Sequence, residues 1–112
     1  MSNASLGRAD PAPVFAALGD GTRLKLVVTL SDGRTRSIAT LAADAGMTRQ
    51  AVTKHLDVLE RAGLVTSARA GRERGFAGRP EPLAATGSWL EGLAAQWDAR
   101  LARLRAVVED PG

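Results

Sequence analysis

Apolar residues in residues 37–62 recur at the three- and four-residue spacing that predicts two consecutive α-helices. In the first helix, Leu41, Ala42 and Ala45 fall on one face, which we expect to be buried. Gly46 follows that face and supplies the left-handed backbone that a tight corner between two helices requires. The segment is therefore predicted to be a helix, a sharp turn and a second helix.

Serine and threonine residues mark where each of these helices begins. Ser37 is placed to cap the first helix and Thr48 to cap the second. In the second helix the apolar stripe consists of Val52, Leu56 and Leu59. The opposite face is polar and carries Gln50, Thr53, Lys54, Asp57 and Arg61. A helix with one apolar and one polar face can be an ordinary core helix. It can also be the second helix of a helix-turn-helix, which enters the major groove of DNA.

Two further helices are predicted before this segment. Asp10-Pro11 is a helix start, and the helix that follows ends at Gly19. Asp20 or Thr22 opens the next helix, which closes before Asp32. This second helix is almost continuously apolar, so we expect it to be buried on most sides and to form the centre of the core. Its apolar residues are Leu24, Val27, Val28 and Leu30.

The hydrophobic period changes after Gly63, where the second helix of residues 37–62, the recognition helix of a helix-turn-helix, should end. Residues 64–66 predict a strand, residues 70–72 a turn and residues 73–77 a weaker returning strand. A hairpin that directly follows a helix-turn-helix is typical of a DNA-contacting wing, although a hairpin could also simply cover the core. The returning strand is rich in glycine, with Gly75 and Gly78 around Phe76, and we expect it to be mobile.

The end of the chain predicts a long helix behind a stiff connector, residues 79–82, that contains two prolines. Gly87 and Gly92 each weaken this helix by about 1 kcal/mol, so its stable part is expected to begin at Ser88. Its apolar seam consists of Leu90, Leu93, Trp97, Leu101, Leu104 and Val108. The seam either folds back on its own domain or pairs with a second subunit. A domain of this size offers little apolar surface, which favours a homodimer.

A homodimer interface built from this helix would also include Phe15 of the first helix and Trp89 beside the seam. A twofold dimer would present two recognition helices about 34 Å apart, for successive major grooves of an inverted repeat.

Length and composition limit the remaining possibilities. The 112 residues suffice for one domain, and 45% are hydrophobic. We expect a flexible segment over residues 1–9, a DNA-binding domain over residues 10–79 and a dimerisation helix over residues 80–112 of the same compact domain. The chain has no cysteine for disulfides or thiolate sites, and no long apolar run or signal sequence, so we expect a cytoplasmic protein without membrane contact.

The net charge of +3 is concentrated in the middle of the chain. Residues 33–79 carry nine Lys or Arg against four acids, a net +5, whereas the remainder is slightly acidic. A basic segment of this kind is expected where a protein meets phosphate, although a solvated surface can also be basic by chance.

Several strings resemble the bacterial ArsR-type winged helix-turn-helix repressors. They are FAALGDGTRLKLVVTL, LAADAGMTRQAVTKHLDVLERAGLV and GRERGF followed by PEPL. The resemblance covers residues 14–76, and the tail is similar to the branch that ends in a W-L…W…R-L…L dimerisation helix. It implies a mainly α fold with a small β-hairpin, namely a winged helix-turn-helix with a long C-terminal dimerisation helix.

The resemblance also implies a set of DNA-contacting residues. The candidates are Ser37, Thr48, Arg49, Gln50, Thr53, Lys54, His55, Arg69, Arg72 and Arg74. Arg49 and Gln50 have the donors for bidentate contacts to guanine and adenine, whereas Thr53 and Lys54 suit phosphates. For His55, the only histidine, we expect a packing or phosphate-contact role rather than sensing.

One departure from the family concerns metals. Its metal sensors carry cysteines around the first helix of the helix-turn-helix, or His and carboxylate ligands on the last helix. Here the first stretch is SIATLAA, and the last helix has no histidine. We therefore predict no metal site, no cofactor and no metal response, and the effector stays open.

The function predicted from the sequence is a homodimeric, sequence-specific DNA-binding transcriptional regulator, most simply a repressor. The alternative is a winged-helix module that docks a protein through the same helix, which Arg49, Gln50 and Lys54 argue against. An enzyme is not expected, because the chain has no Cys, no Tyr, one His and no recognisable pair of carboxylates.

Overall fold

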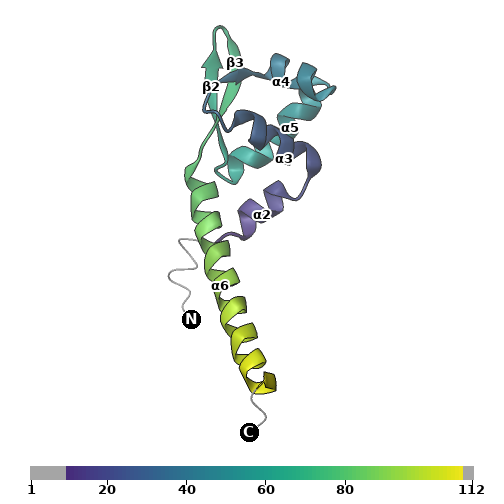
Figure 1. Ribbon diagram of the computed structural model, residues 1–112. Coiled ribbons are helices and arrows are strands. Elements are labelled where there is room, and N and C mark those ends of the chain that lie inside the picture. Colours follow the sequence, from purple (N-terminus) through teal and green to yellow (C-terminus); the bar gives the residue numbers. More distant parts are fainter. Residues whose placement is uncertain (1–9, 110–112) are drawn as a thin grey trace.

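The computed structural model describes residues 10–109, which form a helical body with a small sheet and one long helix that extends away from it (Figure 1). The elements are α2 (Ala12–Leu18), α3 (Gly21–Leu30), β1 (Arg36–Ser37), α4 (Ile38–Ala45), α5 (Arg49–Arg61), β2 (Val65–Ala70), β3 (Glu73–Gly78) and α6 (Glu81–Glu109). The expected flexible segment over residues 1–9 lies outside the described residues. The fold is the winged helix-turn-helix with a long C-terminal helix that the sequence predicts.

Side-chain caps begin three of the helices. The Asp20 carboxylate, the Ser37 hydroxyl and the Thr48 hydroxyl each accept a hydrogen bond of 3.0 Å from the backbone N–H three residues later. Each cap satisfies a donor that a helix start leaves without an intrahelical partner. Gly46 ends α4 with φ 66°, in the left-handed region, so the predicted corner between α4 and α5 is confirmed.

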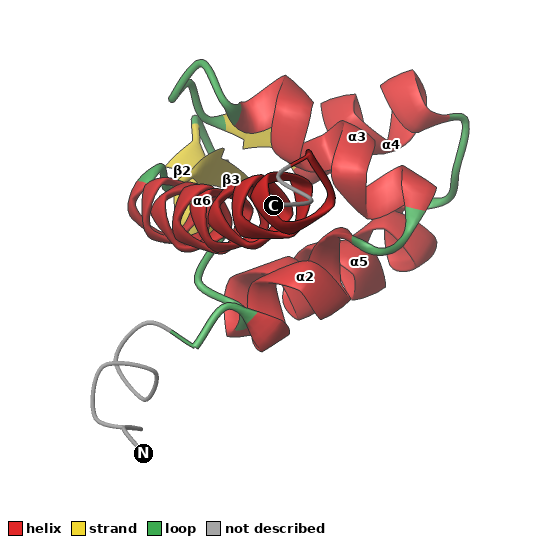
Figure 2. Ribbon diagram, turned by 60° about the horizontal axis from the view of Figure 1, so that its bottom comes forward, coloured by secondary structure: helices red, strands yellow, loops and turns green. Residues whose placement is uncertain are grey.

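The core lies where α3, α4, α5 and the hairpin meet. The predicted stripe of α5 is confirmed, since Val52, Leu56 and Leu59 are completely buried. Phe76 of β3 is also completely buried and closes the core from the side of the sheet. In Figure 1 helices α2 to α5 lie on one side of α6 and of the hairpin, and the turned view of Figure 2 shows α2 and α5 below α6, with α3 and α4 above and to its right.

Two predictions about burial are wrong. Leu24 and Val28 of α3 are 47% and 66% exposed, because only the face with Leu26, Val27 and Leu30 packs against the core. Ala45 is exposed as well, whereas Leu41 and Ala42 of the same helix are buried. Neighbours cover α3 and α4 on one side each, so an apolar residue beyond that side remains in solvent.

The sheet has three antiparallel strands in the order β1-β3-β2, and the sequence did not predict β1. β1 pairs with β3 through Arg36 opposite Phe76 and Ser37 opposite Gly75. A methyl group at Gly75 would lie 3.0 Å from the carbonyl carbon of Arg36 and closer still to its oxygen. A methyl group at Gly78 would overlap the Leu30 carbonyl in the same way. The glycines that suggested mobility therefore allow β3 to approach its neighbours closely.

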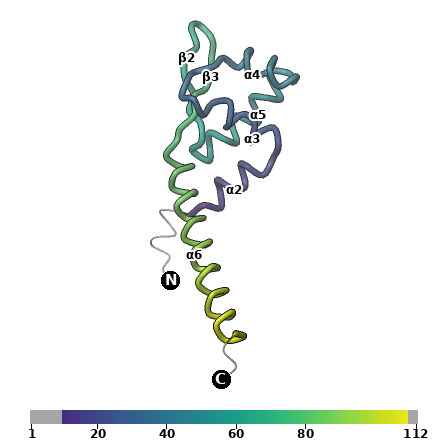
Figure 3. The backbone as a smooth tube through the Cα atoms, viewed as in Figure 1, coloured from purple at the N-terminus to yellow at the C-terminus, as the bar shows by residue number. Residues whose placement is uncertain are grey.

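The last helix differs from the prediction at its start. The expected connector over residues 79–82 and the restart at Ser88 are wrong, because α6 is continuous from Glu81 to Glu109. Prolines are tolerated in the first turn of a helix, where the missing N–H would have no partner. The first turns of α6 pack on the body, with Thr86 buried, and from Leu90 onward the helix is almost entirely exposed. As a result the molecule is 72 Å long (Figures 1 and 3).

Candidate nucleic-acid interface

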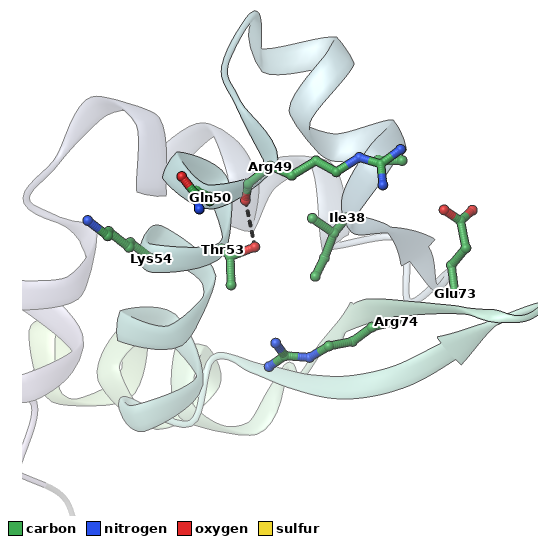
Figure 4. A pocket seen from close by; sticks show the side chains of 8 residues that line it. Ile38, Arg49, Gln50, Thr53, Lys54, Glu73 and Arg74 are labelled. Carbon is green, nitrogen blue, oxygen red and sulfur yellow. Dashed lines mark hydrogen bonds between the residues drawn. The ribbon is translucent and has the colours of Figure 1, made fainter.

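A hollow of about 640 Å³ opens between the N-terminal half of α5 and the start of β3. Its lining combines polar and charged side chains with a small apolar floor, as Figure 4 shows. The lining residues are Ile38, Ala39, Arg49, Gln50, Thr53, Lys54, Glu73 and Arg74. Five of them are DNA-binding candidates from the sequence, and the fold brings these five together from two separate segments.

The first two turns of α5 position most of these side chains. The Thr48 cap fixes the helix start, so Arg49 and Gln50 lie in the first turn, exposed to solvent. Thr53 donates a 2.6 Å hydrogen bond to the Arg49 carbonyl, which holds the hydroxyl against the helix and leaves its oxygen able to accept. Exposed Lys54 follows on the next turn. The positive end of the helix dipole adds to the field of these cations.

The hairpin is held in place by contacts with α5. The Asp57 carboxylate lies 3.5 Å from the Arg74 guanidinium, which also sits 4.9 Å from the centre of the Phe76 ring. One Glu60 carboxylate oxygen accepts hydrogen bonds of 3.1 and 2.9 Å from the backbone N–H and the hydroxyl of Ser67. These contacts join α5 to both strands of the hairpin on the protein surface.

Other sequence candidates lie outside the hollow. Arg69 and Arg72 are exposed on the hairpin and near its tip, where a wing would meet DNA backbone. The buried Ser37 hydroxyl is engaged with Thr40, and His55 lies on another side of α5, with its Nδ1 3.8 Å from the Asp20 carboxylate.

Sequence reasoning missed Ile38, Ala39 and Glu73 as lining residues. The first two follow directly on the Ser37 cap, and that cap position was the available signal for them. The place of Glu73 depends on the register of the hairpin, which the sequence pattern leaves unspecified.

Arg36 is basic and close in sequence to the hollow, yet it is held elsewhere. Its guanidinium donates two hydrogen bonds of 2.9 and 2.8 Å to the two carboxylate oxygens of Asp32, and a third of 3.0 Å to the Thr29 carbonyl. The hydrogen bonds from Arg36 hold the pKa of the Asp32 carboxyl well below its usual range. Arg36 therefore anchors the loop before β1 rather than the hollow.

The second candidate surface is the exposed face of α6. Trp89 packs edge-on against Phe15 of the same chain, with ring centroids 6.0 Å apart, so α2 and α6 are joined within one molecule. Farther along, Trp97, Leu101 and Leu104 are 58%, 52% and 61% exposed. A row of large apolar side chains in solvent is unusual for a monomer and marks an interaction surface.

Comparisons with known proteins identify the family. A family model described as a helix-turn-helix domain matches residues 18–68. The chain is 33% identical over 102 residues to the HTH-type transcriptional regulator Rv2034 of Mycobacterium tuberculosis, covering 91% of this chain and 92% of that protein. It is 38% identical to the solved ArsR-like transcriptional regulator from Rhodococcus sp. RHA1, with a TM-score of 0.77, covering 90% of this chain and 94% of that one. The chain belongs to the ArsR-type helix-turn-helix transcriptional regulators.

Two further relatives extend this picture of the ArsR-type family. An uncharacterised HTH-type transcriptional regulator, YuzN of Bacillus subtilis, is 43% identical over 76 residues, covering 62% of this chain and 83% of that protein. A homodimeric winged helix-turn-helix DNA-binding domain, Mb0332 from Mycobacterium bovis, is 26% identical with a TM-score of 0.63, covering 85% of this chain and 86% of that one. The resemblance drawn from the sequence motifs is confirmed, and with it a role of this ArsR-type chain in transcription regulation.

Two structural observations bear on other classes of site. Within residues 10–109, no three His, Cys, Asp or Glu side chains gather closely enough to share a metal ion. Over the same residues, no helix has the length and apolar character needed to cross a membrane.

Proposed function

We propose that this ArsR-type regulator is a homodimeric repressor that binds an inverted-repeat operator through residues 48–62 and the wing, residues 64–77. The observation that carries the proposal is the hollow between α5 and β3, where donor side chains from both elements converge. The contacts of Asp57 and Glu60 with the hairpin support the proposal, because they join the two sides of the hollow before DNA binds. A preformed surface of this kind loses little conformational entropy on binding.

In this proposal the side chains of the hollow divide into two roles. Arg49 and Gln50 are exposed in the first turn of α5 and have the paired donors and acceptors that read guanine and adenine edges. Lys54, on the next turn of α5, is an exposed cation suited to phosphates, and so are Arg69 and Arg72 of the hairpin, which lie outside the hollow. Base contacts then give the sequence preference, and phosphate contacts give most of the affinity.

The homodimer is proposed from the exposed seam of α6 and from the homodimeric M. bovis relative. Pairing of two seams would remove the apolar side chains from water, which is favourable by about 25 cal/mol per Å² of apolar surface. A twofold axis through the paired helices would direct two α5 helices at successive major grooves. A dimer bound across a promoter would exclude polymerase, and the repressor needs no enzymatic activity of its own.

Selection of genomic fragments tests this function. Purified protein is mixed with fragments of the source genome at about 150 mM salt, a concentration at which nonspecific binding is weakened, and bound DNA is sequenced. Arg49→Ala and Gln50→Ala are compared with Lys25→Ala, which removes a charge from an exposed position on α3. We expect one or a few inverted repeats, lost with the first two variants and kept with the third.

Three results would overturn the proposal. Uniform recovery of all fragments would mean that only nonspecific charge binds DNA. No recovery at all would shift the proposal to a winged-helix module that docks a protein. Equal loss with Lys25→Ala would show that net charge, rather than the first turn of α5, governs the selection.

A further inference from the structure

Glu73 is the only acidic residue that lines the hollow, among five polar or basic side chains. In Figure 4 it rises from the start of β3, facing the opening between the hairpin and α5. A carboxylate at this place is unexpected in a surface that would meet phosphate, because like charges repel. Its position therefore requires an explanation other than affinity.

The carboxylate of Glu73 is not engaged within the protein. Among residues 10–109 it makes no ion pair and no side-chain hydrogen bond, whereas the acids of α5, Asp57 and Glu60, both contact the hairpin. The Glu73 backbone is fixed, because it pairs with Ala70 across a two-residue turn. Gly71 holds φ 69° in that turn, a conformation that favours glycine. The backbone therefore holds Glu73 at the opening of the hollow, and its exposed carboxylate is free to accept from a ligand there.

Two effects follow when DNA fills the hollow. In a register that places a phosphate beside Glu73, repulsion between the two anions weakens the complex. In a register that places a base edge there, the carboxylate accepts a hydrogen bond from an exocyclic amino group such as cytosine N4. The first effect weakens binding to every duplex, because phosphates recur along DNA of any sequence, and the second offsets it only where a cytosine lies at that place.

We propose that Glu73 is a specificity-determining residue that discriminates against non-cognate DNA and accepts a hydrogen bond from a cytosine amino group in the operator. The inference rests on the proposed function, since it assumes that the hollow holds DNA. It adds a specificity element on the wing, outside the recognition helix.

The test compares binding of two duplexes, the operator recovered from the genomic selection and a scrambled duplex of the same composition. Glu73→Gln removes the charge but keeps an acceptor oxygen. Glu81→Gln is the control, because Glu81 is a largely exposed acid at the start of α6, and neither it nor Arg79, its ion-pair partner at 3.7 Å, lines the hollow. Fluorescence anisotropy at about 50 mM salt, where electrostatic differences are large, gives both dissociation constants.

We expect Glu73→Gln to tighten binding of the scrambled duplex by roughly three- to tenfold and to change operator binding by less than about twofold, so that specificity falls. Glu81→Gln should leave the ratio of the two constants unchanged. Equal tightening on both duplexes, no tightening on the scrambled one, or the same shift in the control would overturn the inference. Failure of the proposed function is distinct, because the wild type would then fail to separate the two duplexes.

Discussion

Gly75 offers a sharp test of how the wing is attached to the body. Replacing Gly75 by alanine places a methyl group 3.0 Å from the backbone carbonyl carbon of Arg36 and 3.2 Å from the Cβ atom of Ala70. The two strands must separate by roughly 1 Å to restore ordinary contact distances. The pairing of Ser37 with Gly75 is weakened as a result, and with it the link between β1 and β3.

The size of the effect follows from two opposing terms. Overpacking costs about 1–3 kcal/mol, and the upper half of that range, about 2–3 kcal/mol, applies here because the methyl group would overlap a backbone carbonyl. Replacing a strand glycine recovers about 0.5–1 kcal/mol of backbone entropy. We therefore expect Gly75→Ala to lower the free energy of unfolding by about 1–2.5 kcal/mol, or Tm by roughly 4–20 °C for a domain of this size.

Gly92→Ala is the matched control for this experiment. Nothing lies within 4 Å of a methyl group at Gly92, which sits inside α6, so this variant should gain about 1 kcal/mol from helix propensity. Thermal unfolding followed by circular dichroism at one protein concentration measures both variants. A Gly75→Ala protein that melts at or above the wild-type temperature would refute the close approach of β3 to β1.

Three further predictions concern the seam, an exposed carboxylate and a helix cap. The double variant Leu101→Glu, Leu104→Glu should leave the fold of one chain intact, because both side chains are more than half exposed. It should sediment as a monomer, and a dimer would argue against pairing through the seam. Because the Asp32 pKa is depressed in the folded state, its stabilisation is present above pH about 4 and is lost as pH falls further. Tm of the wild type should therefore exceed that of Asp32→Asn at pH 7, and the difference should narrow progressively as pH falls below about 4. A pH-independent difference would contradict the Arg36 pairing. Ser37→Ala removes the cap of α4 and should cost about 0.5–2 kcal/mol in urea unfolding, and an unchanged free energy of unfolding would contradict the cap.

Local chemistry explains which parts of the fold were predictable. Ser37, Gly46 and Thr48 act on the backbone within a few residues, so caps and the corner could be predicted from the sequence. The hairpin was predicted for the same reason, because Gly71 marks its turn. The family resemblance rested on these same local strings and is confirmed by the relatives.

The misses concern contacts between distant segments. Leu24 and Val28 are as apolar as their buried neighbours, and composition does not say which side of α3 is covered. β1 has only two residues and exists because β3 lies beside it. Glu73 enters the candidate interface through the hairpin register, which a period-two pattern alone does not fix. The DNA and dimer contacts themselves stay predictions, since they lie between molecules.

The spacing of the half-sites tests the central claim most directly. The affinity of the protein for its selected operator is compared with that for the same operator carrying an insertion of about 5 base pairs at the centre, which turns one half-site by about half a helical turn. A rigid dimer that uses two α5 helices at once should lose roughly 100-fold in affinity, since one half-site can no longer be engaged. Unchanged affinity for the lengthened operator would contradict a dimer that reads an inverted repeat.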